Sequence, residues 1–518
     1  MRSTFHGIEV MKRSMFTHQT SLQTVGHNIS NANTKGYSRQ RVNHTSMFPL
    51  EYPSLMRSNL PGQMGQGVEF DSIKRIREAF LDAQYIKEQR DYGTWSIRND
   101  TLNKVEAIMN EPSDTGIRRV LEKFWNSWQD LSKDSENLSA RAVVRETAIA
   151  TADAFNHVYR QLDDLEIDVR TSVEVKVRQI NTYASQLSVL NEQVFRMELL
   201  GHNANDLRDK RDLIIDDLSK IMNISVVEED DGYLVSLGDT ALVDGNEVKT
   251  FVDSSLLQQA YDDGQLTGGE VNGMFYSIDR YTSYYKTQLN SMIVSLVEGE
   301  FKVTLPKGTV IPESAEIDAP PGLLEEDLVV TVKGINQMHQ LGYQLGDPLT
   351  VGEPLFVIKP GGTQMSAETI TLNPNIVSNL SALASSNRTY KDSDGDEHVV
   401  VGNGMNALLI SNIRNSKIKF MDGTDQSLVV AGTYDDFFRS LIGGLGVQAQ
   451  EAKRQETNQR FLVESVDSKR QSISGVSMDE EMADMVKFQH AYNAAARQLT
   501  TFDEMLDKMI NGMGTVGR

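Results

Sequence analysis

The most informative part of the sequence is one long stretch without a helix-breaking residue. Residues 140–200 read ARAVVRETAIATADAFNHVYRQLDDLEIDVRTSVEVKVRQINTYASQLSVLNEQVFRMELL and contain neither glycine nor proline. Apolar side chains recur along this stretch at helical spacing, which predicts a single helix with one buried stripe. The stripe consists of Leu162, Leu165, Val169, Val173, Ile180, Leu187, Val194 and Met197. At 1.5 Å per residue the helix spans about 90 Å, so neighbouring helices must pack along it.

A second amphipathic helix is predicted just before the long one. Its apolar residues alternate spacings of four and three, namely Ile117, Leu121, Phe124, Trp128 and Leu131. The polar stretch Ser132–Ser139 predicts a joint between the two helices. Segments Ile73–Met109 and Phe437–Ile473 are the candidates for the neighbouring helices that complete a bundle.

A helix over Asp206–Met222 is expected next, with Asn205 as its N-cap. Its aspartates interleave with Arg208, Lys210 and Arg211 at helical offsets, which favours ion pairs on the helix surface over a catalytic acid and base. These aspartates are Asp206, Asp209, Asp212, Asp216 and Asp217.

Beyond this helix the sequence becomes strand-like. Residues 224–243 alternate polar and apolar side chains around Asp230, Asp231 and Gly232, which predicts a hairpin. Eight prolines between Pro306 and Pro374 exclude long helices from that window, because proline breaks helix interiors.

The fold class predicted from these patterns is mainly α with a β-rich middle. Helices over Ile278–Glu300 and Val332–Leu341, separated by the loop Lys307–Gly322, are expected within that middle region.

Both chain ends carry amphipathic helices. The N-terminal stripe consists of Ile8, Met11, Met15, Leu22, Val25 and Ile29, interrupted by His18, which we interpret as a packed polar residue rather than a metal ligand. The C-terminal stripe consists of Met482, Met485, Tyr492, Ala496, Leu499, Phe502, Leu506 and Met509. Such stripes form either the seam of a helical hairpin within one chain or a surface for assembly.

Composition excludes several classes of function. A formal charge of −21 opposes nonspecific binding to nucleic acid or to an anionic membrane. The absence of cysteine excludes disulfides, thiol catalysis and cysteine-ligated zinc. No apolar run is long enough for a membrane span, and the first residues lack the pattern of a cleaved leader, so export is expected to use an uncleaved signal.

Two patterns imitate cofactor or metal sites. The glycine-bearing segment Val399–Ala407 resembles a dinucleotide-binding turn, but the helix that follows is too short for a crossover between parallel strands. Asp392, Asp394 and Asp396 alternate like the start of a calcium loop, but Gly395 stands at the fourth position rather than the sixth. We predict no catalytic residue, no metal and no cofactor.

The exit of the first helix carries the most specific motif. Residues 28–40 read NISNANTKGYSRQ. Asparagine and glycine are typical of helix ends, so a local capping role is one interpretation. The string also resembles the N-terminal signature of the flagellar axial proteins, the family of rod, hook and hook-associated subunits. The residues that carry the resemblance are Asn28, Asn31, Asn33, Thr34, Gly36, Tyr37, Arg39 and Gln40.

Further stretches are similar to the hook-associated members of this family that join the hook to the filament. They are residues 205–219, residues 402–409, residues 474–482 and residues 489–496. A hook subunit shares the first signature but is expected to have an almost entirely β middle. The departure from the family pattern is residues 303–327, which interrupt the helix expected to lead into Val332–His339.

The resemblance implies a structural subunit of the bacterial flagellum, outside the cell at the hook–filament junction. It implies type III export, an export chaperone bound to the C-terminal helix, and contacts with hook protein, the next junction protein and further copies of the chain. The terminal helices are then expected to pair as a coiled coil inside a tube.

The expected domains are an N-terminal axial helix with its signature loop (1–48), a linker (49–72), a long-helix bundle (73–222, completed by about 436–473), a β-rich outer region (223–435, with inserted helices at about 278–341) and a C-terminal axial helix (474–518). Three alternatives stay open on the residues alone. They are a cytosolic coiled-coil scaffold, another axial protein such as a hook subunit, and a secreted enzyme, for which no convergent nucleophile and base appear.

Overall fold

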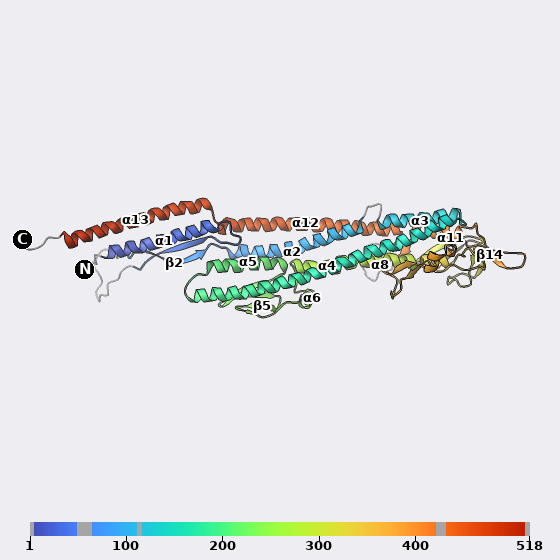
Figure 1. Cartoon of the computed structure of the whole chain (residues 1–518), viewed down its shortest axis with the longest axis horizontal. Helices are drawn as coiled ribbons and strands as arrows, with labels where there is room; N and C mark the ends of the chain where they lie inside the picture. The colour runs from blue at the N-terminus through green and yellow to red at the C-terminus, as the bar shows by residue number, and fades with distance from the viewer. Residues whose placement is uncertain (1–4, 49–64, 111–115, 421–430, 513–518) are drawn as a thin grey trace, which may run out of the picture. The chain divides into compact units, whose positions relative to one another are not determined.

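The computed structural model describes residues 5–48, 65–110, 116–420 and 431–512. The chain is mainly helical with small sheets in its middle, as predicted (Figure 1). The helices are α1 (His6–Asn31), α2 (Ala79–Met109), α3 (Ile117–Lys133), α4 (Leu138–Leu199), α5 (Asn205–Ile221), α6 (Ser254–Asp262), α7 (Glu270–Ser277), α8 (Ser283–Glu298), α9 (Gly334–Gln340), α10 (Pro374–Ser378), α11 (Met405–Asn412), α12 (Tyr434–Ser474) and α13 (Met478–Asn511).

The strands of the described residues pair antiparallel. One sheet has four strands in the order β3 (Ser225–Glu229), β4 (Gly232–Leu237), β5 (Thr240–Asp244) and β6 (Glu247–Val248). The others are pairs: β1 (Gln40–Ser46) with β2 (Val68–Arg75), β7 (Glu300–Leu305) with β10 (Leu328–Lys333), β8 (Val310–Ile311) with β9 (Gly322–Leu323), β11 (Phe356–Ile358) with β12 (Ile370–Leu372), β13 (Thr389–Lys391) with β14 (Glu397–Val399), and β15 (Ile418–Lys419) with β16 (Ala431–Gly432).

The chain divides into two compact units. The first comprises residues 1–94, 174–272 and 457–518, and the second comprises residues 95–173 and 273–456. Both chain ends and the signature motif belong to the first unit. The finer division into five domains stays a prediction.

The buried stripe of α4 is confirmed with one exception. The residues from Leu162 to Val194 in this stripe are at most 7% exposed, whereas Met197 is 41% exposed. Met197 lies in the last turn of the helix, close to the chain reversal at Gly201. The helix itself is also confirmed, from Leu138 to Leu199.

The stripe of α3 is confirmed completely, and it forms part of the core of the second unit. Phe124 and Trp128 are fully buried, and the Phe124 ring packs against Phe356 of β11 at a centroid distance of 6.1 Å. The predicted joint is present as well, because α3 ends at Lys133 and α4 begins at Leu138.

Residues 300–333 form a β excursion between α8 and α9 in the second unit. β7 and β10 pair along their whole length, and the Gly334 amide donates to the Gly299 carbonyl at 2.8 Å, so the excursion begins and ends at one place. Gly334 has φ +64°, and a Cβ on it would lie 1.9 Å from the Val297 carbonyl oxygen. Residues 303–327, expected from the resemblance to depart from the family pattern, therefore lie within an excursion that is closed at its base.

Three predicted helix boundaries are wrong. The helix expected from Ile73 begins at Ala79, because Ile73 pairs with Val42 in the β1–β2 hairpin. The helix expected at Val332 begins at Gly334, because Val332 belongs to β10. The helix expected at Ile278 begins at Glu270 and passes through a π-helical turn, Ile278–Thr282, into α8.

The predicted hairpin at residues 230–232 is confirmed by β3 and β4. Asn205, in contrast, is the first residue of α5 rather than its N-cap, which is Ala204. Its side chain donates to the Ile73 carbonyl of β2 at 2.9 Å. A bond to a remote strand therefore takes the place of the local cap.

Candidate assembly site

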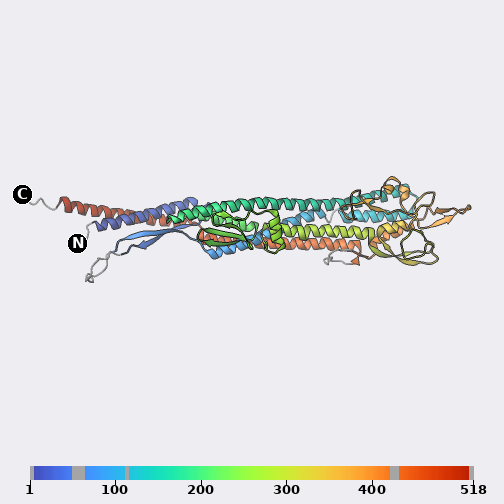
Figure 2. The same ribbon diagram turned by 90° about the horizontal axis from the view of Figure 1, so that it is seen from below.

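The two terminal helices lie side by side in the first unit, running antiparallel (Figures 1 and 2). Their seam is the packed surface between α1 and α13. Gly7 faces Phe502 near the chain ends, and the His18 ring lies 6.2 Å from the Phe488 ring further along. Asn28 then meets Glu481, with a bond of 3.0 Å from Asn28 Nδ2 to Glu481 Oε2. The pairing of the terminal helices is thus as predicted.

The residues of the N-terminal stripe are buried or half-buried in the single chain. Val25 is buried, and Ile8, Met11, Met15, Leu22 and Ile29 are half-buried. The other side of α1 packs on the β1–β2 hairpin, which runs beside it in Figure 2. There Thr17 donates to the Val68 carbonyl and Ser21 bonds His44.

The C-terminal stripe lies only partly in the seam. Most of its members are half-buried, namely Met485, Tyr492, Ala496, Leu499, Phe502 and Leu506. Met482 and Met509 are 50% and 43% exposed and lie outside the seam.

Three seam residues were not identified from the sequence: Glu481, Phe488 and Ala495. Steps of exactly seven residues back from Phe502 reach all three, so a strict heptad repeat was the signal that could have found them. A looser repeat of three and four residues places Gln489 in the stripe instead of Phe488, but Gln489 is exposed.

The signature motif is built around Asn28, which is 1% exposed. Its Nδ2 donates to the Gln40 carbonyl at 2.9 Å as well as to Glu481. Its Oδ1 accepts from the Tyr37 hydroxyl at 2.7 Å and from the Gln40 amide at 3.0 Å. Asn28 therefore links α1, the signature loop and α13, which a purely local cap does not do.

Arg39 adds a charged contact to the same place. Its Nε donates to Glu481 Oε1 at 2.6 Å, and its backbone amide donates to the Ser474 carbonyl at the end of α12 at 2.8 Å. Glu481 is 1% exposed, and a buried carboxylate requires a partner of this kind. We call Asn28, Tyr37, Arg39, Gln40 and Glu481 the Asn28 cluster.

The remaining signature residues shape the loop. Asn31 accepts from the Thr34 hydroxyl at 3.3 Å, and Asn33 and Thr34 are exposed. Gly36 has φ +82°, and a Cβ on it would lie 3.2 Å from Leu213 of α5. A left-handed backbone held this close to a neighbouring helix favours glycine at position 36.

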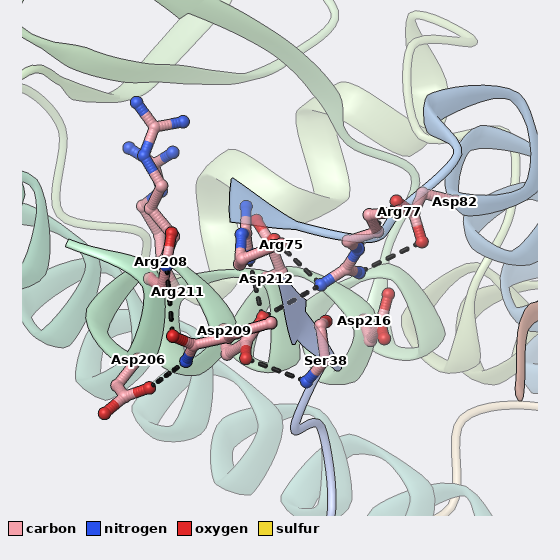
Figure 3. A network of polar contacts seen from close by, with 12 residues as sticks. Ser38, Arg75, Arg77, Asp82, Asp206, Arg208, Asp209, Arg211, Asp212 and Asp216 are labelled. Carbon is pink, nitrogen blue, oxygen red and sulfur yellow. Dashed lines mark hydrogen bonds and ion pairs between the residues drawn. The ribbon is translucent and has the colours of Figure 1, made fainter. Parts of the chain in front are cut away.

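A buried ion network fixes α5 to the rest of the first unit (Figure 3). Arg75 Nη1 bonds Asp209 at 2.7 Å and Asp212 at 2.8 Å, and Asp209 also accepts from the Ser38 amide. Arg77 bonds Asp212 at 2.9 Å. The prediction of surface ion pairs within α5 is wrong for these aspartates, because the partners come from β2 and from the segment that follows it.

Asp216 pairs with α12 instead. Arg470 Nη1 lies 2.7 Å from its carboxylate, and the guanidinium stacks over the Tyr85 ring at 4.0 Å. Burial raises the pKa of Asp216 to about 6 despite Arg470. At Asp212, burial also opposes ionisation, but Arg77 and Arg75 hold the pKa below its ordinary value. Ion pairs, hydrogen bonds and a cation–π contact therefore join the signature loop, β2, α2, α5 and α12.

The sites that imitate cofactor or metal binding are local turns. The Asp392 carboxylate accepts from the backbone amides of Asp394 and Asp396, both at 2.9 Å, in the turn between β13 and β14. Val399–Ala407 leads from β14 into α11 through a bond from the Met405 amide to Asn403. Among the described residues, no helix has the length and apolarity needed to cross a membrane.

Comparisons with known proteins agree with this arrangement. Residues 102–299 match the helical domain of flagellar hook-associated protein FlgK, and residues 468–512 match the C-terminal domain of the flagellar basal body rod proteins FlgEFG. The second match covers all of α13 and the end of α12.

Whole-chain relatives are also similar. Flagellar hook-associated protein 1 of Bacillus subtilis is 32% identical over all of both chains. The protein of the same name from Salmonella typhimurium is 24% identical over 95% of this chain and 97% of its own length. A solved structure of the flagellar hook junction protein FlgK from Burkholderia pseudomallei has the same fold, with a TM-score of 0.51 at 14% identity, over 75% of this chain and all of that one.

Proposed function

Because this chain belongs to the family of flagellar hook-associated protein 1, whose members are structural components of the flagellum and not enzymes, we propose that it joins the hook to the filament. In this proposal copies of the chain form a short tubular layer outside the cell. The paired helices α1 and α13 form its inner wall, and residues of about 225–435 project outward.

The observation that carries the proposal is the apolar surface left uncovered on the terminal pair. Exposed apolar side chains of α1 and α13 include Phe16, Met478, Met482, Val486, Met505 and Met509, each at least 43% exposed. Fully burying a side chain of this size is worth about 1.5–3 kcal/mol. Neighbouring copies in a tube supply the surface against which these residues are buried.

Methionine suits a junction in particular. Its unbranched side chain adapts to neighbours of different shape, and a junction layer meets hook protein on one side and the next hook-associated protein on the other. Four of these exposed residues are methionines of α13, namely Met478, Met482, Met505 and Met509.

Export precedes assembly in the proposal. The chain passes through the flagellar type III apparatus, with a chaperone on the exposed apolar residues of α13. Gly26 lies within α1, where glycine lowers helix stability by about 0.5–1 kcal/mol relative to alanine. An isolated α1 is therefore only marginally stable and gains order when it packs.

Electron microscopy of a deletion strain tests the junction role, together with an assay for filament subunit in the culture medium. We expect complete hooks without filaments and free filament subunit in the medium. Normal filaments in the deletion strain would contradict the proposal and favour a cytosolic scaffold, which cell fractionation would then detect.

Substitutions in the seam test the tubular assembly separately. Leu22→Asp and Leu499→Asp each place a charge among half-buried apolar residues, so we expect normal export but loss of incorporation at the hook tip. Thr500→Asp, at an exposed position beside Leu499, is the matched control and is expected to assemble. Incorporation of both seam variants at the wild-type level would refute this mode of assembly.

A further inference from the structure

An open groove runs between α4 and α5 in the first unit. Its volume is about 850 Å³, and its apolar lining consists of Val189, Leu190, Leu213, Ile214 and Phe251. Val189 is 50% exposed and Phe251 is 68% exposed, so these side chains face solvent in the single chain.

The rim of the groove is polar, and Lys210 is the only charged residue among the described residues that line it. The described residues contribute no carboxylate to the lining. In a chain of net charge −21, such a surface is one to which an acidic partner can bind without repulsion.

A ridge of matching character lies at the start of α13. Met478, Met482 and Val486 follow one another at intervals of four residues and are 45%, 50% and 51% exposed. The exposed Asp479 stands in the first turn of the helix, next to Met478. The ridge is distinct from the seam, in which Glu481, Met485 and Phe488 lie.

The ridge is short enough to fit within the groove. The ridge covers eight residue steps, or about 12 Å, and the α4 side of the groove, from Asn181 to Gln193, covers twelve steps, or about 18 Å. An apolar ridge of one helix between two others is the ordinary mode of helix packing.

The two surfaces also lie at the same level of the first unit. Leu213 lines the groove and also a second cavity of about 290 Å³ beneath the signature loop. That second cavity is lined by Ser474, Gly475 and Val476, the residues just before the ridge. Both surfaces are exposed in the single chain, so the ridge of a copy does not fill its own groove.

We propose that the ridge Met478–Met482–Val486 of one copy docks into the α4–α5 groove of a second copy, with Asp479 next to Lys210. This inference rests on the proposed function, because it names the lateral contact within the tubular layer. A contact between two different surfaces repeats from copy to copy and generates a ring or a helix, whereas a contact of a surface with itself stops at a dimer.

The absence of cysteine from the chain allows a direct test. The full-length double variant Val189→Cys/Met482→Cys is produced in the deletion strain, and isolated hook–filament particles are treated with a mild oxidant. We expect a ladder of disulfide-linked dimers and higher species on a non-reducing gel, and none with either single variant.

The matched control is Val189→Cys/Thr500→Cys. Thr500 is exposed on the same face of α13 as Met482 but lies eighteen residues, or about 27 Å, further along the helix. A ladder of equal strength from this pair, or no ladder from the first pair in particles that contain it, would overturn the docking. Functional particles without the ladder would leave the junction role intact and remove only this contact.

Exchanging the charges of Lys210 and Asp479 provides a second, independent test. We expect Lys210→Glu to reduce incorporation at the hook tip, and Asp479→Lys in the same chain to restore it. The proposal would be contradicted if Lys210→Glu were incorporated at the wild-type level. It would also be contradicted if Asp479→Lys alone assembled but the double variant did not recover incorporation. If the groove instead serves an export chaperone, Lys210→Glu lowers secretion of the chain, and this outcome also overturns the copy-to-copy contact.

Discussion

Gly7 of α1 lies directly against the ring of Phe502 of α13: a Cβ on Gly7 would lie 2.6 Å from the Cζ atom of that ring. At Gly26 of the same helix, no atom of the described part of the chain lies within 4 Å of the corresponding position. From the sequence, both glycines simply weaken the helix. The structure gives Gly7 a packing role that Gly26 lacks.

The two glycines of α1 are expected to respond differently to alanine. Gly26→Ala should stabilise α1 by about 0.5–1 kcal/mol, because alanine costs less backbone entropy in a helix. Gly7→Ala should lose that gain, since the added methyl group displaces the Phe502 ring. Hydrogen exchange of the α1 and α13 amides measures both effects. Equal protection of the two variants would show that the contact is unimportant, and Gly7→Ala/Phe502→Leu is expected to recover the gain.

Glu481 and Glu480 form a matched pair for testing the Asn28 cluster. Glu481→Gln leaves the mostly buried Arg39 without its buried carboxylate partner, so we expect a loss of about 3 kcal/mol in the free energy of unfolding. Glu480 also bonds Arg39, but its side chain is 65% exposed, and Glu480→Gln should cost less than about 1 kcal/mol. Urea denaturation followed by circular dichroism compares them, and similar losses would argue against the cluster as a buried anchor.

Packing of the terminal helices is expected to weaken below neutral pH. Burial, followed by the proximity of His44, lowers the pKa of His18 below 6.5. Burial, followed by Lys487 and Arg41, lowers the pKa of His44. As the pH falls below 6.5 the unfolded chain binds protons that the folded chain does not, so stability decreases toward the folded pKa values. Above 6.5 both states hold neutral imidazoles and the effect vanishes.

Thermal unfolding between pH 7.5 and 5 measures this dependence. His18→Gln should flatten the decrease, because His18 Nδ1 is buried without a hydrogen-bond partner among the described residues and a second proton there has no acceptor. His490→Gln, at an exposed position of α13, should not change the slope. An unchanged slope in His18→Gln would reject this origin of the pH dependence.

Closure of the excursion between α8 and α9 is expected to require glycine at position 334. Gly334→Ala forces a side chain into a left-handed backbone and onto the Val297 carbonyl, at a cost of about 3 kcal/mol. Gly346→Ala is the control, since a Cβ on Gly346 would have no atom of the residues that the structure describes within 4 Å. The buried Trp125 and Trp128 report unfolding of the second unit by fluorescence. Equal stability of the two variants would contradict the close contact.

The helices and the apolar stripes that they bury could be predicted from the amino-acid sequence. The absence of glycine and proline from residues 140–200 and the repeat of Leu162, Val169 and Val173 suffice for α4, because helical periodicity is a local property of the chain. The pairing of the terminal helices also followed from local spacing, together with the resemblance carried by residues 28–40.

The hydrogen bonds and ion pairs between remote polar residues could be identified only from the tertiary structure. Asn28 and Glu481 are 453 positions apart, and Asp209 finds Arg75 at a separation of 134. Nothing in the spacing within α5 distinguishes Asp209 and Asp212, which are buried, from the exposed Asp206. A buried charge requires an ion-pair or hydrogen-bond partner. In this fold the partners belong to strands and helices that come from remote parts of the chain. Periodicity therefore predicts which side of a helix is buried, whereas the partners of its charged residues depend on long-range packing.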